Sequence, residues 1–137
     1  MKAFFDSSAF AKRFVDEAGS EIAEALCGSA DALGLSVICL PEIVSALNRL
    51  LRERKLTASQ YRQAKRRLLD DVRDADIVQL TAPVVGTAIR VLETSPVRAM
   101  DALHIACALE WGADVFVSAD KRQMAAAKRA GIKIEKA

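Results

Sequence analysis

The chain has 137 residues, of which 52% are hydrophobic, and this suits a single domain with one core over residues 1–137. The formal net charge is only +2, yet residues 49–73 hold nine Lys or Arg against three acids, so this basic flank faces either solvent or an anionic partner. No secretion signal is visible and no apolar run approaches the ~20 residues of a membrane span, which argues against a membrane protein and predicts a cytoplasmic one.

The first elements are a short strand and two helices. Residues 2–5 form an apolar run that predicts a buried strand. Asp6 then opens a helix, because its carboxylate can accept the free backbone N–H groups of the first turn. A second helix is expected over residues 20–29, with Ile22 and Leu26 on one face.

A strand and a basic helical hairpin follow. Residues 35–40 are a second apolar run and predict a second strand. Pro41 comes next and is a favoured first helical residue, and residues 42–54 continue with apolar side chains at helical spacing. A further helix completes a hairpin over residues 42–73, which carries the basic residues.

The second half of the chain continues the alternation of strands and helices. Its expected strands are residues 77–80, 114–117 and 132–134. Its expected helices are residues 83–93, a helix from Asp101 to Gly112, and a last helix that opens at 118–120 and runs to Ala130. This order predicts a three-layer α/β/α sandwich around a mostly parallel sheet of four to five strands.

Four acids are expected at one edge of this sheet. Asp6 follows the first strand, Glu42 follows the second within two residues, and Asp120 follows the fourth. Asp101 opens the helix that leads into the fourth strand, so it starts at the same carboxyl edge, where open parallel sheets bind ligands. Helix capping alone could also explain acids at these ends. If the four converge, a cation must offset their repulsion, and oxygen-only ligands suit Mg²⁺ or Mn²⁺.

Other chemistries fit the sequence less well. The six glycines form neither a phosphate-binding loop nor a dinucleotide fingerprint, and there is no G-x-S-x-G motif. His104 is the only histidine, so cleavage of RNA by a pair of histidines and zinc binding by a Cys/His set are both excluded. His104 lies three residues after Asp101, which favours a supporting role. The three scattered cysteines predict core thiols in a reducing compartment.

At four places the sequence resembles the PIN-domain nucleases, and among them the VapC-type toxins of bacterial toxin–antitoxin pairs. The opening resembles the family's D-x-S-A motif, and Ser118 stands where the family usually has Thr. The matching segments are Phe5-Asp6-Ser7-Ser8-Ala9, Pro41-Glu42-Ile43-Val44-Ser45-Ala46, Asp101-Ala102-Leu103-His104-Ile105-Ala106 and Val117-Ser118-Ala119-Asp120. The resemblance covers the length of the chain, and four motifs in the right order make it specific.

The resemblance implies an endoribonuclease that uses Mg²⁺ or Mn²⁺. Asp6 and Asp101 would be the principal metal ligands, and Glu42 and Asp120 would complete the acidic pocket. The metal would lower the pKa of a bound water and orient it toward an RNA phosphodiester. Ser8 and Ser118 would support the acids or contact phosphate.

The resemblance also implies partners. Relatives are homodimers, and a small VapB-type antitoxin covers their pocket, so an antitoxin side chain such as Arg could compete with the metal. Candidate contacts to RNA on the basic hairpin are Arg49, Arg52, Lys65 and Arg66. Two alternatives remain open at this stage: a PIN-fold module that binds RNA or a partner without cutting, and a PIN nuclease that acts on DNA or precursor rRNA.

Overall fold

A computed structural model describes residues 1–137 and shows a sheet of five strands, all parallel, in the order β3-β2-β1-β4-β5. The strands are β1 (Lys2–Phe5), β2 (Ala32–Ser36), β3 (Asp76–Val78), β4 (Val115–Ser118) and β5 (Lys133–Lys136). From the central β1 the chain adds β2 and β3 on one side and later β4 and β5 on the other. The strand order therefore reverses at β1, and the carboxyl ends of β1 and β4 flank the crevice in which such sheets bind ligands.

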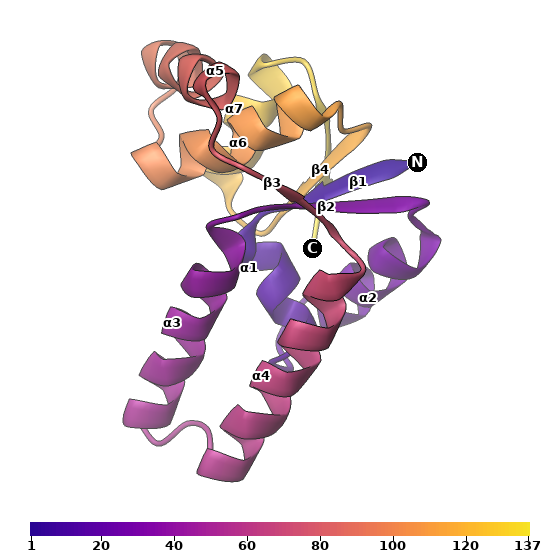
Figure 1. Ribbon diagram of the computed structural model, residues 1–137, viewed down its shortest axis with the longest axis vertical. Helices are drawn as coiled ribbons and strands as arrows, with labels where there is room; N and C mark the ends of the chain where they lie inside the picture. The colour runs from indigo at the N-terminus through magenta and orange to yellow at the C-terminus, as the bar shows by residue number, and fades with distance from the viewer.

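Helices cover both faces of the sheet, which confirms the predicted α/β/α sandwich (Figure 1). One face carries α1 (Ser7–Phe10) with the 3₁₀ turn η1 (Ala11–Arg13), α2 (Ser20–Ser29), α3 (Cys39–Arg52) and α4 (Ala58–Arg73). The other face carries α5 (Ala82–Thr94), α6 (Ala99–Trp111) and α7 (Lys121–Arg129). Two apolar cores result, because alternate side chains of β1 point to opposite faces: Ala3 and Phe5 to the first, Phe4 to the second.

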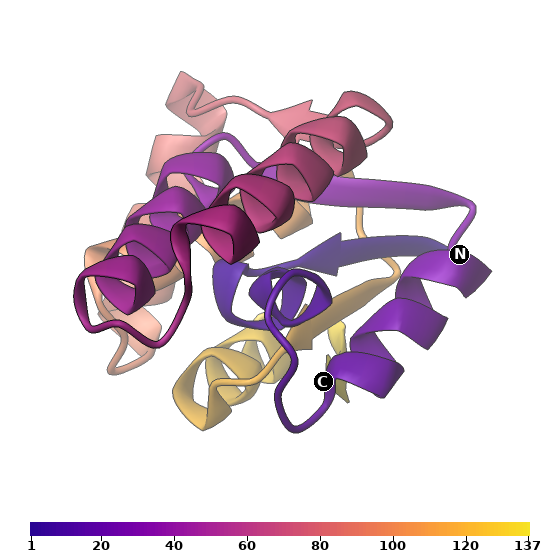
Figure 2. The same ribbon diagram turned by 90° about the horizontal axis from the view of Figure 1, so that it is seen from below.

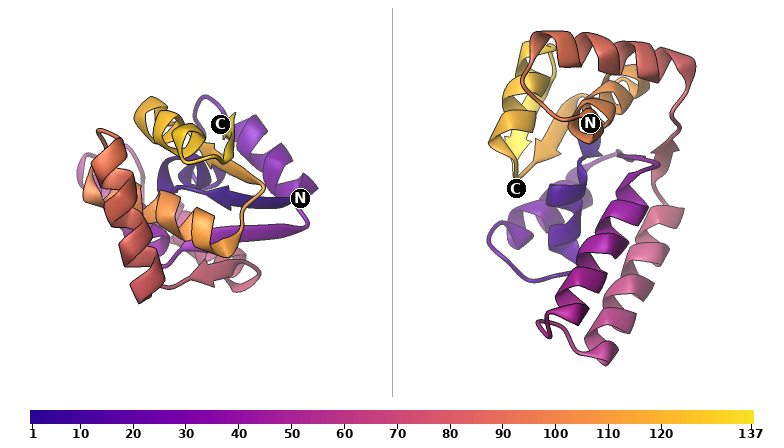
Figure 3. Two further views of the ribbon diagram at one scale, coloured as in Figure 1. Left: turned by 90° about the horizontal axis from the view of Figure 1, so that it is seen from above. Right: turned by 90° about the vertical axis from the view of Figure 1, so that its left-hand side faces the viewer.

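Helices α3 and α4 form the predicted hairpin, which extends beyond the sheet (Figures 1 and 2). Seen from the side, the hairpin and the α5–α7 layer lie at opposite ends of the molecule (Figure 3). Leu47 of α3 and Leu68 of α4 are fully buried in the first core. Asn48 Nδ2 donates to Tyr61 Oη at 2.9 Å, which ties the two helices together. None of the helices combines the length and apolar character that a membrane span requires.

The bounds predicted for the second strand were wrong. The second strand ends at Ser36, and Cys39 already belongs to α3, so the apolar run 35–40 is divided between a strand, a turn and a helix. Glu42 consequently lies within the first turn of α3 rather than directly after a strand. Helix α2 has the predicted bounds; its buried side chain is Ala23, and Ile22 is 50% exposed because the helix is covered on one side only.

Candidate active site

Asp6 is a fully buried acid at the junction between β1 and α1. Its Oδ1 accepts the backbone N–H of Ala9 at 2.9 Å and the hydroxyl of Ser8 at 2.8 Å. Its Oδ2 accepts the hydroxyl of Ser118 at 2.6 Å, from the end of β4. Burial raises the pKa of Asp6, and these three bonds only partly oppose that rise. Asp6 has no Lys or Arg partner, and its direct polar contacts are these three hydrogen bonds.

Ser118 connects Asp6 to Asp120, the N-cap of α7. The Ser118 hydroxyl donates to Asp6 and accepts the backbone N–H of Asp120 at 2.9 Å. Asp120 Oδ1 in turn accepts the backbone N–H groups of Arg122 at 2.8 Å and Gln123 at 3.2 Å. The hydroxyl predicted to support the acids thus contacts one of them and orders the loop that carries another.

Gln123 extends this network to Asp101, in the first turn of α6. The buried Gln123 side chain donates from Nε2 to Asp101 Oδ1 at 3.0 Å, while Asp101 Oδ2 accepts the backbone N–H of Arg98 at 3.3 Å. Gln123 Oε1 is buried without a partner. Three aspartates from α6 and from the ends of β1 and β4 therefore belong to one hydrogen-bonded network.

Glu42 projects from the first turn of α3 and meets a second set of donors. Its Oε1 accepts the Ser7 hydroxyl at 2.7 Å and lies 2.5 Å from His104 Nε2. Partial burial raises the pKa of Glu42, but the hydrogen bonds from His104 and Ser7 outweigh it, so the net shift is downward. Glu42 is therefore held as a carboxylate at neutral pH.

His104 is almost fully buried on α6, with only 2% of its surface exposed. A carboxylate can only accept, so the Nε2 atom that faces Glu42 carries a hydrogen and donates it. Nδ1 is buried and has no hydrogen-bond partner. Such an orphaned group costs about 1–3 kcal/mol of stability.

The four acids lie at the predicted carboxyl edge, but not in a single cluster. No three His, Cys, Asp or Glu side chains form a ready-made metal-ligand group. Glu42 lines one pocket, and Asp101 and Asp120 line a second. Each carboxylate is held by nearby donors, among them backbone N–H groups, Gln123 and hydroxyls. Their roles as metal ligands stay a prediction.

The donor set still fits a hard divalent cation. All four side chains offer carboxylate oxygens, and Asp6, Asp101 and Asp120 form no salt bridge with any Lys or Arg. Mg²⁺ keeps several of its waters and needs only one or two protein carboxylates, so it does not require a preformed cage of three.

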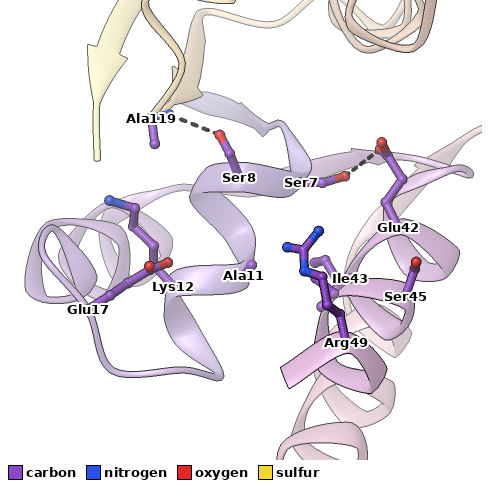
Figure 4. Close-up of a pocket in the computed structure, with 11 residues that line it drawn as sticks. Ser7, Ser8, Ala11, Lys12, Glu17, Glu42, Ile43, Ser45, Arg49 and Ala119 are labelled. Carbon is purple, nitrogen blue, oxygen red and sulfur yellow. Dashed lines mark hydrogen bonds between the residues drawn. The ribbon is translucent and has the colours of Figure 1, made fainter. Parts of the chain in front are cut away.

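Basic side chains line both pockets. In the first pocket Arg49 extends from α3 toward the space between Glu42 and α1, and Lys12 lies across from it (Figure 4). The second pocket is lined by Arg98, Lys121 and Arg122. Of the four basic residues predicted to contact RNA, only Arg49 lines either pocket. Arg52, Lys65 and Arg66 are exposed farther along the hairpin.

Several site residues were missed from the sequence. Gln123 follows Asp120 by three residues, and Arg98 precedes Asp101 by three, so both could have been found by placing neighbours on the first helical turn. Ser7 lies beside the predicted Ser8, and only the fold shows that it faces Glu42. No feature of the sequence near Lys12 indicated that its side chain would line the first pocket.

Comparisons with known proteins give consistent results. The sequence matches the family described as "PIN domain" over residues 3–129. It is 35% identical over 133 residues to "Ribonuclease VapC45" and "Ribonuclease VapC49" of two Mycobacterium tuberculosis strains, covering 96% of this chain and 92% of each relative. Among solved structures, the fold is similar to that of Mycobacterium tuberculosis VapC20, described as a sarcin-ricin loop cleaving toxin (TM-score 0.70, 19% identity, 95% of both chains). It is also similar to VapBC-1 of nontypeable Haemophilus influenzae (TM-score 0.70, 13% identity, 99% of this chain and 98% of that one).

Proposed function

Because the chain belongs to the PIN-domain family, we propose that it is a metal-dependent endoribonuclease toxin of the VapC type. The observation that carries the proposal is the network joining Asp6, Asp101 and Asp120 through Ser118 and Gln123 at the edge where the strand order reverses. The identity to two ribonucleases over nearly the whole chain agrees with it.

The four acids would hold the metal. Glu42 comes from α3, on the face of the sheet opposite to α6 and α7. We assign Asp6, Glu42, Asp101 and Asp120 as ligands of Mg²⁺ or Mn²⁺, directly or through water. When bound, the ion supplies a more acidic water and neutralises charge on the phosphodiester. The chain itself orients these side chains through Ser7, Ser8, Ser118, His104 and Gln123.

The two basic pockets support a path for the RNA strand. Arg49 and Lys12 lie on one side of the acids, and Arg98 lies with Lys121 on the other. Cationic side chains on both sides would bind the phosphates that flank the cleaved one, with an affinity that falls as salt rises. The remaining predicted contacts, Arg52, Lys65 and Arg66, would extend this path along the hairpin formed by residues 42–73.

A VapB-type antitoxin is the proposed inhibitor. Uncompensated carboxylates attract a guanidinium as well as a metal ion, and Arg pairs with carboxylates in a planar, two-bond geometry. An antitoxin Arg inserted at Glu42 or Asp101 would both displace the metal and block the binding of RNA.

A homodimer is proposed from an unpaired apolar face on α5. Val85, Ile89 and Leu92 are 45%, 51% and 40% exposed and follow one another at helical spacing. A contiguous apolar stripe of this kind suits a two-fold contact in which the same patch meets itself. We place the protein in the cytoplasm, where its RNA substrate is found and where its three free thiols would stay reduced.

The test is cleavage of matched RNA and DNA oligonucleotides by purified protein, with Mg²⁺ or Mn²⁺ and with excess chelator. The proposal expects RNA to be cut, cutting to stop with chelator, and DNA to stay intact. Cleavage of DNA instead of RNA would identify the protein as a PIN nuclease that acts on DNA. Binding of RNA without cutting under all conditions would make it a binding module and refute the proposed activity.

A further inference from the structure

Glu42 differs from the other three acids in how it is anchored. Asp6, Asp101 and Asp120 each accept at least one backbone N–H, which fixes their side chains to the start of a helix. Glu42 accepts none, and it is also the longest and most flexible of the four side chains. Its position therefore depends on side-chain donors.

Both donors bind the same carboxylate oxygen. The Ser7 hydroxyl and His104 Nε2 converge on Oε1, at 2.7 and 2.5 Å, and lie 3.2 Å from each other. No group of the chain donates to Oε2. The arrangement fixes one oxygen of Glu42 and leaves the other available at the pocket.

His104 is an unusual choice for the interior of an apolar helix. Its neighbours on α6 include the fully buried Ile105 and Ala106, and its own Nδ1 is buried without a partner. A leucine of similar size would fill this space with no orphaned polar atom. Packing alone does not account for a histidine here, whereas the bond to Glu42, which comes from the opposite layer of the fold, does.

We propose that His104 is a positioning residue, whose Nε2–H holds Oε1 of Glu42 so that Oε2 is presented to the divalent ion. The inference rests on the proposed function, because it takes Glu42 as a metal ligand. It assigns His104 no contact with RNA and no part in proton transfer.

The experiment measures Mn²⁺ binding to the full chain by calorimetry, without RNA, together with thermal unfolding. His104→Leu removes the donor, and His104→Gln restores an amide donor on a side chain of similar reach. Ile105→Val is the matched control, because it alters the next buried position of the same helix and does not touch Glu42. Glu42→Gln and Asp101→Asn report on the metal site itself.

His104→Leu is expected to weaken Mn²⁺ binding roughly 10–100-fold, as for other residues that orient a metal ligand. Its melting temperature should stay close to that of the wild type, because removal of the orphaned Nδ1 offsets loss of the bond to the partly exposed Glu42. His104→Gln should recover part of the affinity. Ile105→Val should lower the melting temperature by roughly 2–6 °C and leave the affinity unchanged.

The possible outcomes distinguish the proposed role of His104 from the proposed metal site. Wild-type Mn²⁺ affinity in His104→Leu, with weaker binding in Glu42→Gln, would overturn the role of His104 and leave the proposed function standing. Unchanged affinity in both Glu42→Gln and Asp101→Asn would refute the metal site, and the inference with it. If His104→Leu does not fold, His104→Met and Ser7→Ala decide, since each removes one of the two donors to Oε1; wild-type affinity in both would overturn the proposal.

Discussion

Replacing Ser118 with alanine tests how the buried Asp6 carboxylate is held. The Ser118 hydroxyl is the only donor to Asp6 Oδ2, and the distance between the two oxygens is 2.6 Å. The same hydroxyl accepts the backbone N–H of Asp120 at 2.9 Å. Ser118→Ala therefore leaves a fully buried charged oxygen without a partner and releases the start of α7.

The expected loss of stability follows from these two bonds. A hydrogen bond to a charged group contributes about 1.5–3 kcal/mol, and the half-buried Asp120 N–H adds up to about 1 kcal/mol because water can partly replace its partner. Ser118→Ala should thus lower the free energy of unfolding by about 2–4 kcal/mol.

Urea unfolding followed by circular dichroism at pH 7 measures this loss. Ser59→Ala, an exposed position on α4 whose hydroxyl makes no hydrogen bond within the chain, is the control and should stay within about 0.5 kcal/mol of the wild type. In an Asp6→Asn background the same Ser118→Ala change should cost about 1–1.5 kcal/mol less, because the bond to residue 6 then joins neutral groups while the loss at the Asp120 N–H is the same. A loss below about 0.5 kcal/mol in the wild-type background would refute the description of Asp6 as a carboxylate held by hydroxyls.

Three further predictions concern buried polar groups and thiols. Burial raises the pKa of Asp6 above its ordinary 3.8, so the ionised form is disfavoured in the folded state. Asp6→Asn should therefore gain stability relative to the wild type as pH rises from below 3.8 toward neutrality. Urea midpoints between pH 3 and 8 measure this difference, and a difference that does not change with pH would contradict the raised pKa. Gln123→Met removes the donor to Asp101 Oδ1 and should weaken Mn²⁺ binding roughly 10-fold with little change in melting temperature, which calorimetry and thermal unfolding check together. Burial raises the pKa of Cys27 to about 11 and that of Cys39 to about 12, so neither thiol should react with iodoacetamide at pH 8 until the protein is unfolded, as intact-mass spectrometry can show.

The aspartates of the site could be placed from the sequence because their positions are local. Asp6 and Asp120 each stand between a strand and a helix, where an N-cap carboxylate satisfies free N–H groups, and the structure shows both caps. Parallel strand order then brings such junctions to one edge of the sheet. Glu42 lies at the expected edge, although the strand before it was predicted to extend too far. The strand end was misplaced because apolar periodicity does not separate a strand end from the first turn of a buried helix.

Contacts between layers could not be derived in the same way. His104 and Glu42 are 62 residues apart and come from opposite faces of the sheet, so no spacing in the sequence joins them. Charge counting identified a basic hairpin but not its orientation, which is why Arg49 lines a pocket while Lys65 and Arg66 do not. Sequence spacing places Gln123 beside Asp120 on the first turn of α7, but it does not predict the contact between its side chain and Asp101 of α6.

The central claim is that carboxylates at the switch in strand order support metal-dependent cleavage of RNA. The most direct measurement is the rate at which wild type and Asp101→Asn cut one RNA oligonucleotide at saturating Mn²⁺, with circular dichroism to show that both are folded. We expect a rate at least about 100-fold lower for Asp101→Asn, with its fold retained. An equal rate in the two proteins, or a wild-type rate that survives excess chelator, would contradict it.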